Sequence, residues 1–142
     1  MDRQPHLSIL DTPVWLRLME GDPGLGGEIV DAIERSAALG SLYVATLSLW
    51  EVAILEAVGR IRFTVPVDIW LADAIETPGL NLLEIDVRIA AESARLPGPF
   101  DGDAVDRMLV GAARSRSGCL YTSDPAIIAY GRLGYVDIRE VS

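Results

Sequence analysis

Four acidic residues, far apart in the chain, lie where apolar runs give way to helical patterns. They are Asp11, Glu51, Asp106 and Asp124. Carboxylates that a fold brings together repel one another, and a hard cation or a bound proton relieves that repulsion. We therefore interpret these four residues as a candidate cation site.

Asp11 and Asp124 also fit a purely structural role. Both precede helical patterns, where aspartate is a favoured N-cap, and Pro125 is a common first residue of a helix. Both residues also end apolar runs that look buried, and an unpaired buried carboxylate would be costly. Capping alone is therefore an incomplete explanation of these two positions.

Glu51 and Asp106 have a structural alternative of their own. Glu51 lies three residues after Ser48, which is the spacing of a capping box, and Asp106 stands in nearly the same relation to Asp103. A cap and a cation site thus compete as explanations at each of the four positions.

The elements that would position these acids alternate along the chain. Apolar runs predict strands at 7–10, 42–45, 80–85 and 119–122, with an edge strand at 135–138. Helical spacing predicts helices near 14–19, 28–39, 47–58, 66–76, 86–96, 103–118 and 125–133. Such alternation is typical of a parallel sheet covered on both faces, whose ligand sites form beyond the carboxyl ends of the strands. We expect the four carboxylates to meet at that edge.

The composition limits the classes of function. The chain has 142 residues, half of them apolar, and a net charge of -9, so we expect one well-packed domain without a broad nucleic-acid footprint. All twelve basic residues are arginine, and the lack of lysine excludes P-loop phosphate binding and Schiff-base catalysis. Metal ions or a local strip of arginines would therefore have to contact an RNA. The candidate arginines are Arg60, Arg62, Arg107, Arg114 and Arg116.

Other residue types are scarce. Cys119 and His6 are the only cysteine and histidine, which excludes an internal disulfide and a histidine-rich zinc site. The first residues lack the apolar core of a signal peptide, and we expect a cytoplasmic protein without a membrane segment. We expect the three tryptophans, Trp15, Trp50 and Trp70, to anchor helices in the core or at a protein interface.

Four motifs, in this order, resemble those of the PIN-domain ribonucleases, and among them the VapC-type toxins of bacterial toxin–antitoxin pairs. They are Leu10-Asp11-Thr12, SLWEVA at 48–53, GDAVDRMLV at 102–110 and LYTSD at 120–124. The chain departs from the usual family pattern at Pro13, Leu55 and Pro125, where relatives often carry a polar or basic residue. The resemblance covers nearly the whole length and implies a single PIN-like domain over 1–142, a three-layer α/β/α sandwich with a central parallel sheet of four to five strands.

The resemblance also implies roles for individual residues. Metal-binding acids fall on Asp11, Glu51, Asp106 and Asp124, with Asp103 as an accessory. Thr12 and Thr122 match hydroxyl positions beside the metal site.

The implied reaction is hydrolysis of RNA phosphodiester bonds that depends on Mg²⁺ or Mn²⁺. Asp11 and Asp106 are expected as direct ligands, and Glu51 and Asp124 as residues that act through water. A cognate antitoxin and a homodimer are the implied protein partners.

Two other functions compete with this hypothesis. A PIN-like binding module without catalysis would keep the fold and lose the reaction. A metal-dependent phosphohydrolase with Asp11 as nucleophile is less well supported, because it would need a second aspartate two residues later, where this chain has Pro13.

Overall fold

The computed structural model of the chain describes residues 6–142. Its strands are β1 (Ser8–Leu10), β2 (Leu42–Ala45), β3 (Leu80–Leu83), β4 (Cys119–Thr122) and β5 (Asp137–Glu140). Its α-helices are α1 (Thr12–Met19), α2 (Gly27–Ala38), α3 (Thr46–Ala57), α4 (Val67–Ala74), α5 (Val87–Ala94), α6 (Ala104–Ser115) and α7 (Pro125–Arg132), with a 3₁₀ turn at Pro23–Leu25. The alternation predicted from the sequence is confirmed, although the last strand begins two residues later than predicted.

All five strands form one parallel sheet in the order β3-β2-β1-β4-β5. The chain winds outward from β1 through β2 to β3, then crosses back to place β4 on the other side of β1. The strand order therefore reverses at β1 and β4, the position at which open parallel sheets form ligand sites. The predicted parallel sheet of four to five strands is confirmed.

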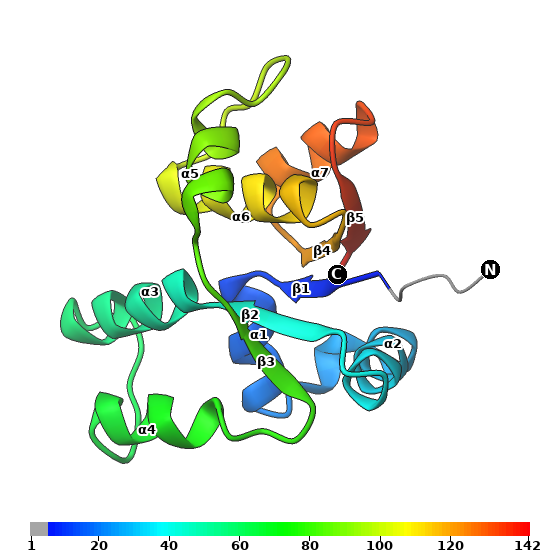
Figure 1. Cartoon of the computed structure of the whole chain (residues 1–142). Helices are drawn as coiled ribbons and strands as arrows, with labels where there is room; N and C mark the ends of the chain where they lie inside the picture. Colours follow the sequence, from blue (N-terminus) through cyan, green and yellow to red (C-terminus); the bar gives the residue numbers. More distant parts are fainter. Residues whose placement is uncertain (1–5) are drawn as a thin grey trace.

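Helices cover both faces of the sheet, as Figure 1 shows, with α5, α6 and α7 on one side and α1, α2 and α4 on the other. Alternate side chains of each strand point to opposite faces. Ile9 and Leu120 belong to the core under α5–α7, whereas Leu10, Val44 and Tyr121 belong to the core that includes α1 and α2. Each such side chain contributes about 1.5–3 kcal/mol when fully buried. The three-layer α/β/α architecture is confirmed.

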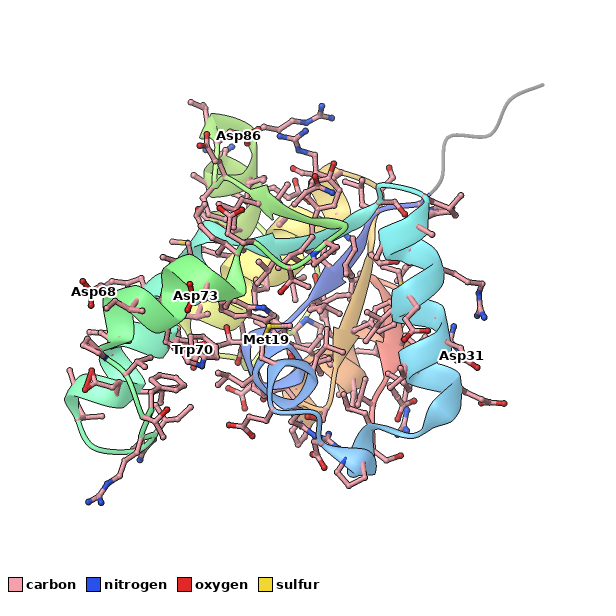
Figure 2. The ribbon with its side chains drawn as sticks, turned by 90° about the horizontal axis from the view of Figure 1, so that it is seen from below. Met19, Asp31, Asp68, Trp70, Asp73 and Asp86 are labelled. Atoms are coloured by element: carbon pink, nitrogen blue, oxygen red, sulfur yellow. The ribbon has the colours of Figure 1, made fainter. Side chains whose placement is uncertain are left out.

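Two of the three tryptophans anchor the layer that contains α1 and α4. Trp15 is fully buried, and the edge of its ring contacts Trp70 with the centroids 5.7 Å apart. Trp70 stacks on Phe63 at 4.3 Å and lies between α4 and the α1 residue Met19 in Figure 2. Trp50 differs, because 57% of its surface is exposed. Core burial is therefore confirmed for Trp15, whereas Trp50 is not a core residue.

A close approach of α5 and α6 fixes the position of the helix that carries Asp106. A Cβ atom on Gly111 would lie 3.0 Å from the Cα atom of Ser93, so only glycine permits this spacing without a shift. Arg107 adds a hydrogen bond from its Nε to the carbonyl oxygen of Ser93, at 3.2 Å. The beginning of α6 is thereby held against α5.

The helices between residues 6 and 142 are all shorter or more polar than a bilayer-spanning helix must be.

Candidate active site

The carboxyl ends of the two central strands bring Asp11 and Asp124 together. Asp11 follows β1 and caps α1, and Asp124 follows β4 and caps α7. Because β1 and β4 are neighbours in the sheet, the amide of Asp11 donates to the carbonyl oxygen of Tyr121 at 3.0 Å. The capping role is therefore confirmed for both residues, and the strand order also places them side by side, while their role as metal ligands stays a prediction.

Asp11 is held in a buried network of hydrogen bonds. It is 2% exposed; its Oδ1 accepts from the amide of Val14 at 2.9 Å, and its Oδ2 accepts from the hydroxyl of Thr122 at 2.6 Å. The same hydroxyl oxygen accepts from the amide of Asp124 at 3.0 Å. Each carboxylate oxygen of Asp11 retains one lone pair for a further partner. This network fixes the orientation of the Asp11 carboxylate and leaves both of its oxygens able to accept a further partner.

Glu51 and Asp106 approach the same edge on α3 and α6. Asp106 lies in the first turn of α6, and Asp103 caps that helix by accepting from the amide of Asp106 at 2.9 Å. Glu51 lies in the second turn of α3, which begins at Thr46 directly after β2. The predicted capping box at Ser48 and Glu51 is therefore wrong, because the N-cap of α3 is Ala45 and no side chain caps it.

Thr12 and Ser48 form a buried pair that sequence reasoning missed. The Thr12 hydroxyl donates to the Ser48 hydroxyl oxygen at 2.8 Å, and this bond ties the beginning of α1 to α3. Thr122 contacts the Asp11 carboxylate directly, whereas Thr12 faces Ser48. The contribution of Thr12 to the site is to position the helix that carries Glu51.

Burial, and to a smaller extent repulsion by other acids, raises the pKa values of two carboxyl groups of the site. Burial raises the pKa of Asp11 from 3.8 to about 6, more than the hydrogen bonds from Thr122 and Val14 lower it, and Asp124 and Glu51 raise it further. Burial also raises the pKa of Asp106 from 3.8 to about 7, with Asp124, Asp103 and Glu51 adding repulsion. Asp124 and Glu51 thus act on both groups, as the predicted convergence requires.

The donor set fits a hard divalent cation. The four side chains offer only carboxylate oxygens, and repulsion among them is the condition that a cation relieves. Across residues 6–142, no three acidic, histidine or cysteine side chains are placed close enough together to hold a metal ion among them. Mg²⁺ is usually bound by one or two carboxylates and keeps several waters, so a complete protein shell is not required.

Three of the candidate arginines have other partners. Arg107 bonds Ser93 and lies 5.8 Å from the ring centroid of Phe100. Arg114 pairs with Glu92 at 2.7 Å and Arg116 with Asp86 at 2.9 Å. These two arginines lie about 12–15 Å along α6 from Asp106, at 1.5 Å per residue. The contacts given for these three arginines are thus with groups other than the four carboxylates of the site.

Comparison with known proteins agrees with this geometry. The PIN domain family model matches residues 8–133. The chain is 35% identical over 93 residues to Ribonuclease VapC22 of Mycobacterium tuberculosis. The aligned segment covers 66% of this chain and 68% of that protein.

Solved structures share the fold. The VapBC2 complex of Rickettsia felis bound to a promoter DNA fragment matches with a TM-score of 0.70 at 13% identity, covering 96% of this chain and 99% of that chain. FitAcB of Neisseria gonorrhoeae matches with a TM-score of 0.62 at 20% identity, covering 93% of this chain and 96% of that chain. With four carboxylates at the carboxyl ends of a five-stranded parallel sheet and a family match over 8–133, the chain belongs to the PIN domain family.

Proposed function

We propose that this protein is a metal-dependent endoribonuclease that hydrolyses RNA phosphodiester bonds. The observation that carries the proposal is the convergence of Asp11, Glu51, Asp106 and Asp124 from four separate segments at one edge of the sheet. The similarity to Ribonuclease VapC22 supports the same reaction class.

The roles of the residues follow from their surroundings. Asp11, fixed by Val14 and Thr122, and Asp106, held at the first turn of α6, would bind Mg²⁺ or Mn²⁺. Such an ion supplies charge neutralisation at the phosphate and acidifies water. Glu51 and Asp124 supply the other two carboxylates of the site and would orient a water molecule for attack on phosphorus. Asp103 maintains the beginning of α6 as its cap.

We expect RNA cleavage by the purified protein to require a divalent ion. Total bacterial RNA should be cut in Mg²⁺ or Mn²⁺, left intact in excess EDTA, and cut again when the metal is restored, because the ion offsets the repulsion that four carboxylates exert on a phosphate. Gel electrophoresis of the RNA measures the effect. Cleavage at an undiminished rate in EDTA, by protein free of other nucleases, would contradict the metal mechanism.

A cognate antitoxin is the proposed protein partner. One of the structures with this fold, VapBC-5 of Mycobacterium tuberculosis, is a member of the VapBC family of toxin-antitoxin systems, and VapBC2 of Rickettsia felis is bound to a DNA fragment from its promoter. The net charge of -9 and the carboxylate-lined site suit a basic peptide, whose arginine could pair with Asp11 or Asp106. We further propose that the protein acts as a toxin in the cytoplasm, where its RNA substrate lies, and that it forms a homodimer.

Expression with and without the neighbouring gene tests the toxin proposal. The protein alone should slow growth of its host, and co-expression of a small DNA-binding neighbour should restore growth and yield a co-purified complex. Colony counts and affinity purification measure the two effects. Normal growth with an active protein and no co-purified partner would reject the toxin role and leave the nuclease proposal standing.

One observation favours a second candidate, a PIN-like binding module with weak or no catalysis. The chain has no lysine, and Arg107, which follows Asp106 in the chain, donates its Nε–H to the carbonyl oxygen of Ser93. The cleavage assay in Mg²⁺ separates the two functions, because a binding module would retain RNA without cutting it.

A further inference from the structure

The loop that leads into α6 delivers Asp103 and Asp106 to the site without any regular structure of its own. It spans residues 96–102, between the end of α5 and the residue that caps α6. Residues 96–102 make no backbone–backbone hydrogen bond with any residue from 6 to 142. Side chains must therefore hold this loop in place, and they determine where α6 begins.

Tyr130 on α7 holds the first half of the loop. This residue is 1% exposed, and its hydroxyl donates to the carbonyl oxygen of Pro97. Its ring stacks on that of Tyr135 with the centroids 4.8 Å apart. Gly98 lies so close to Tyr135 that a Cβ atom on Gly98 would come within 2.6 Å of the ring atom Cε2. Pro97 and Gly98 are thus fixed to α7 and to the turn that follows it.

Phe100 extends this support to the beginning of α6. Its ring meets the ring of Tyr130 edge to face, with the centroids 5.1 Å apart and an interplanar angle of 66°. A Cβ atom on Gly102 would lie 2.7 Å from Cε1 of Phe100 and 3.0 Å from the Cβ atom of Asp106. Phe100 and Asp106 therefore leave no room for a methyl group on the glycine between them.

The same helix connects this packing to a second carboxylate of the site. Asp124 caps α7, and Tyr130 follows it six residues later, about 9 Å along the helix axis. Because Asp124 and Tyr130 belong to one helix, the contacts of Tyr130 tie the loop before Asp106 to the helix that Asp124 caps. The relative position of the two carboxylates thus depends on the Phe100–Tyr130 contact.

Asp106 needs this support more than Asp11 does. Hydrogen bonds at 2.9 and 2.6 Å orient the two oxygens of Asp11 directly. Asp106 is supported through its backbone, where its amide donates to the cap residue Asp103, and through the close packing at Gly102. Mg²⁺ requires near-ideal octahedral geometry and takes few protein ligands, so a displaced carboxylate weakens its binding.

We propose that Phe100 and Tyr130 position the Asp106 carboxylate for cation binding, and that Phe100 does so through its contact with Gly102. Both are positioning residues, because they act through Asp106 and not on the cation or the RNA. The inference rests on the proposed metal-dependent function and adds to it two aromatic residues outside the acidic set.

The first experiment measures Mn²⁺ binding to the full chain without RNA, from the electron paramagnetic resonance signal of free Mn²⁺. Phe100→Ala and Gly102→Ala should each raise the Kd of Mn²⁺ by roughly 10- to 100-fold, the loss typical of residues that orient metal ligands. Tyr130→Phe should raise it less, because the ring that contacts Phe100 remains. In cleavage assays, the Mn²⁺ concentration that gives the half-maximal rate should rise by the same factor as the Kd.

Two control variants separate positioning from a general loss of stability. Gly79 precedes β3, at the edge of the sheet opposite the site, and has a φ of +80° with the Cβ atom of Ala37 only 2.7 Å from the place of an added Cβ. Gly79→Ala should therefore lower the Tm and leave the Kd of Mn²⁺ unchanged. Tyr43→Phe removes a hydroxyl from another tyrosine packed against the same core as Tyr130 and should also leave the Kd unchanged. If Gly79→Ala weakens Mn²⁺ binding as much as Phe100→Ala does, lost stability explains the effect and the positioning role is wrong.

A double variant tests whether Phe100 acts through Gly102. Phe100→Ala removes the ring that a methyl group on residue 102 would meet. The double variant Phe100→Ala with Gly102→Ala should therefore raise the Kd by much less than the product of the two single effects, as residues in contact are expected to do. A Kd equal to that product would show that the two residues act independently, which overturns the proposed contact.

The remaining outcomes distinguish this inference from the ribonuclease function. Unchanged Kd values in both Phe100→Ala and Gly102→Ala, with a wild type that binds Mn²⁺ and cleaves RNA, would overturn the positioning role and leave the nuclease standing. Weaker Mn²⁺ binding in these variants of a wild type that cleaves no RNA would support the positioning role and reject the ribonuclease. A wild type that binds no Mn²⁺ would reject both.

Discussion

Asp106→Asn and Asp11→Asn are each expected to lower the rate of RNA cleavage by roughly two to four orders of magnitude, the effect of losing several kcal/mol of charge stabilisation at the reacting phosphate. Asparagine keeps the shape of the side chain but loses the negative charge that would bind the cation. Both residues are held in place by their own helices, so the loss should come from chemistry rather than from misfolding. Single-turnover cleavage of a labelled RNA measures the rate.

Asp31→Asn supplies the matched control. Asp31 is an exposed acid on α2, where Figure 2 labels it, and α2 lies at the opposite end of the molecule from α3 in Figure 1. Its replacement changes the net charge by the same amount. It should cleave at the wild-type rate. A variant at Asp11 or Asp106 that melts normally and still cleaves at the wild-type rate would exclude that residue from the active site.

Much of the site could be predicted because its residues serve local structure as well. Asp11 and Asp124 end apolar runs and begin helices, and both properties can be seen in the sequence. Parallel strands place such residues at one edge whatever their order along the sheet. Element type alone therefore predicted a shared edge for these acids, and the strand order, with β4 beside β1, brings Asp11 and Asp124 together there.

Other features depend on contacts that no local pattern reports. The capping role considered for Ser48 is wrong, because α3 continues directly from β2 without a capping side chain and Ser48 instead bonds Thr12. The exposure of Trp50 was also unpredictable, since an apolar residue on a helix is usually buried. Only the placement of α6 beside α3 shows that Trp50 borders a pocket.

The stability of the metal-free protein is expected to fall as pH rises from about 4 to 7. The pKa of Asp11 is about 6 in the folded protein and that of Asp106 about 7, whereas both are near 3.8 when the chain is unfolded. The folded state therefore binds more protons in this window. The stability that these two groups contribute is complete below pH about 3.8 and is lost as pH rises through their folded pKa values.

The expected contribution to the free energy of unfolding differs between Asp11 and Asp106. For the buried Asp11, a rise in pKa of about two units corresponds to about 3 kcal/mol at pH 8. Asparagine would recover this amount, less about 1 kcal/mol for the hydrogen bond that Thr122 donates to Oδ2. Asp106 is only half-buried, so solvent screening makes its effect smaller.

Thermal melts in EDTA at pH 4, 6 and 8 test the predicted loss of stability with rising pH. Asp11→Asn should melt about 4–8 °C above wild type at pH 8, which is the shift expected for about 2 kcal/mol, and the advantage should disappear near pH 4. Asp106→Asn should change in the same direction, and Asp31→Asn should follow wild type at every pH. Added Mg²⁺ should raise the Tm of wild type at pH 8 and have little effect on either site variant, because an ion that binds only the folded state stabilises it. If both site variants melt below wild type at pH 8, the carboxylates act only as helix caps and do not repel one another as described.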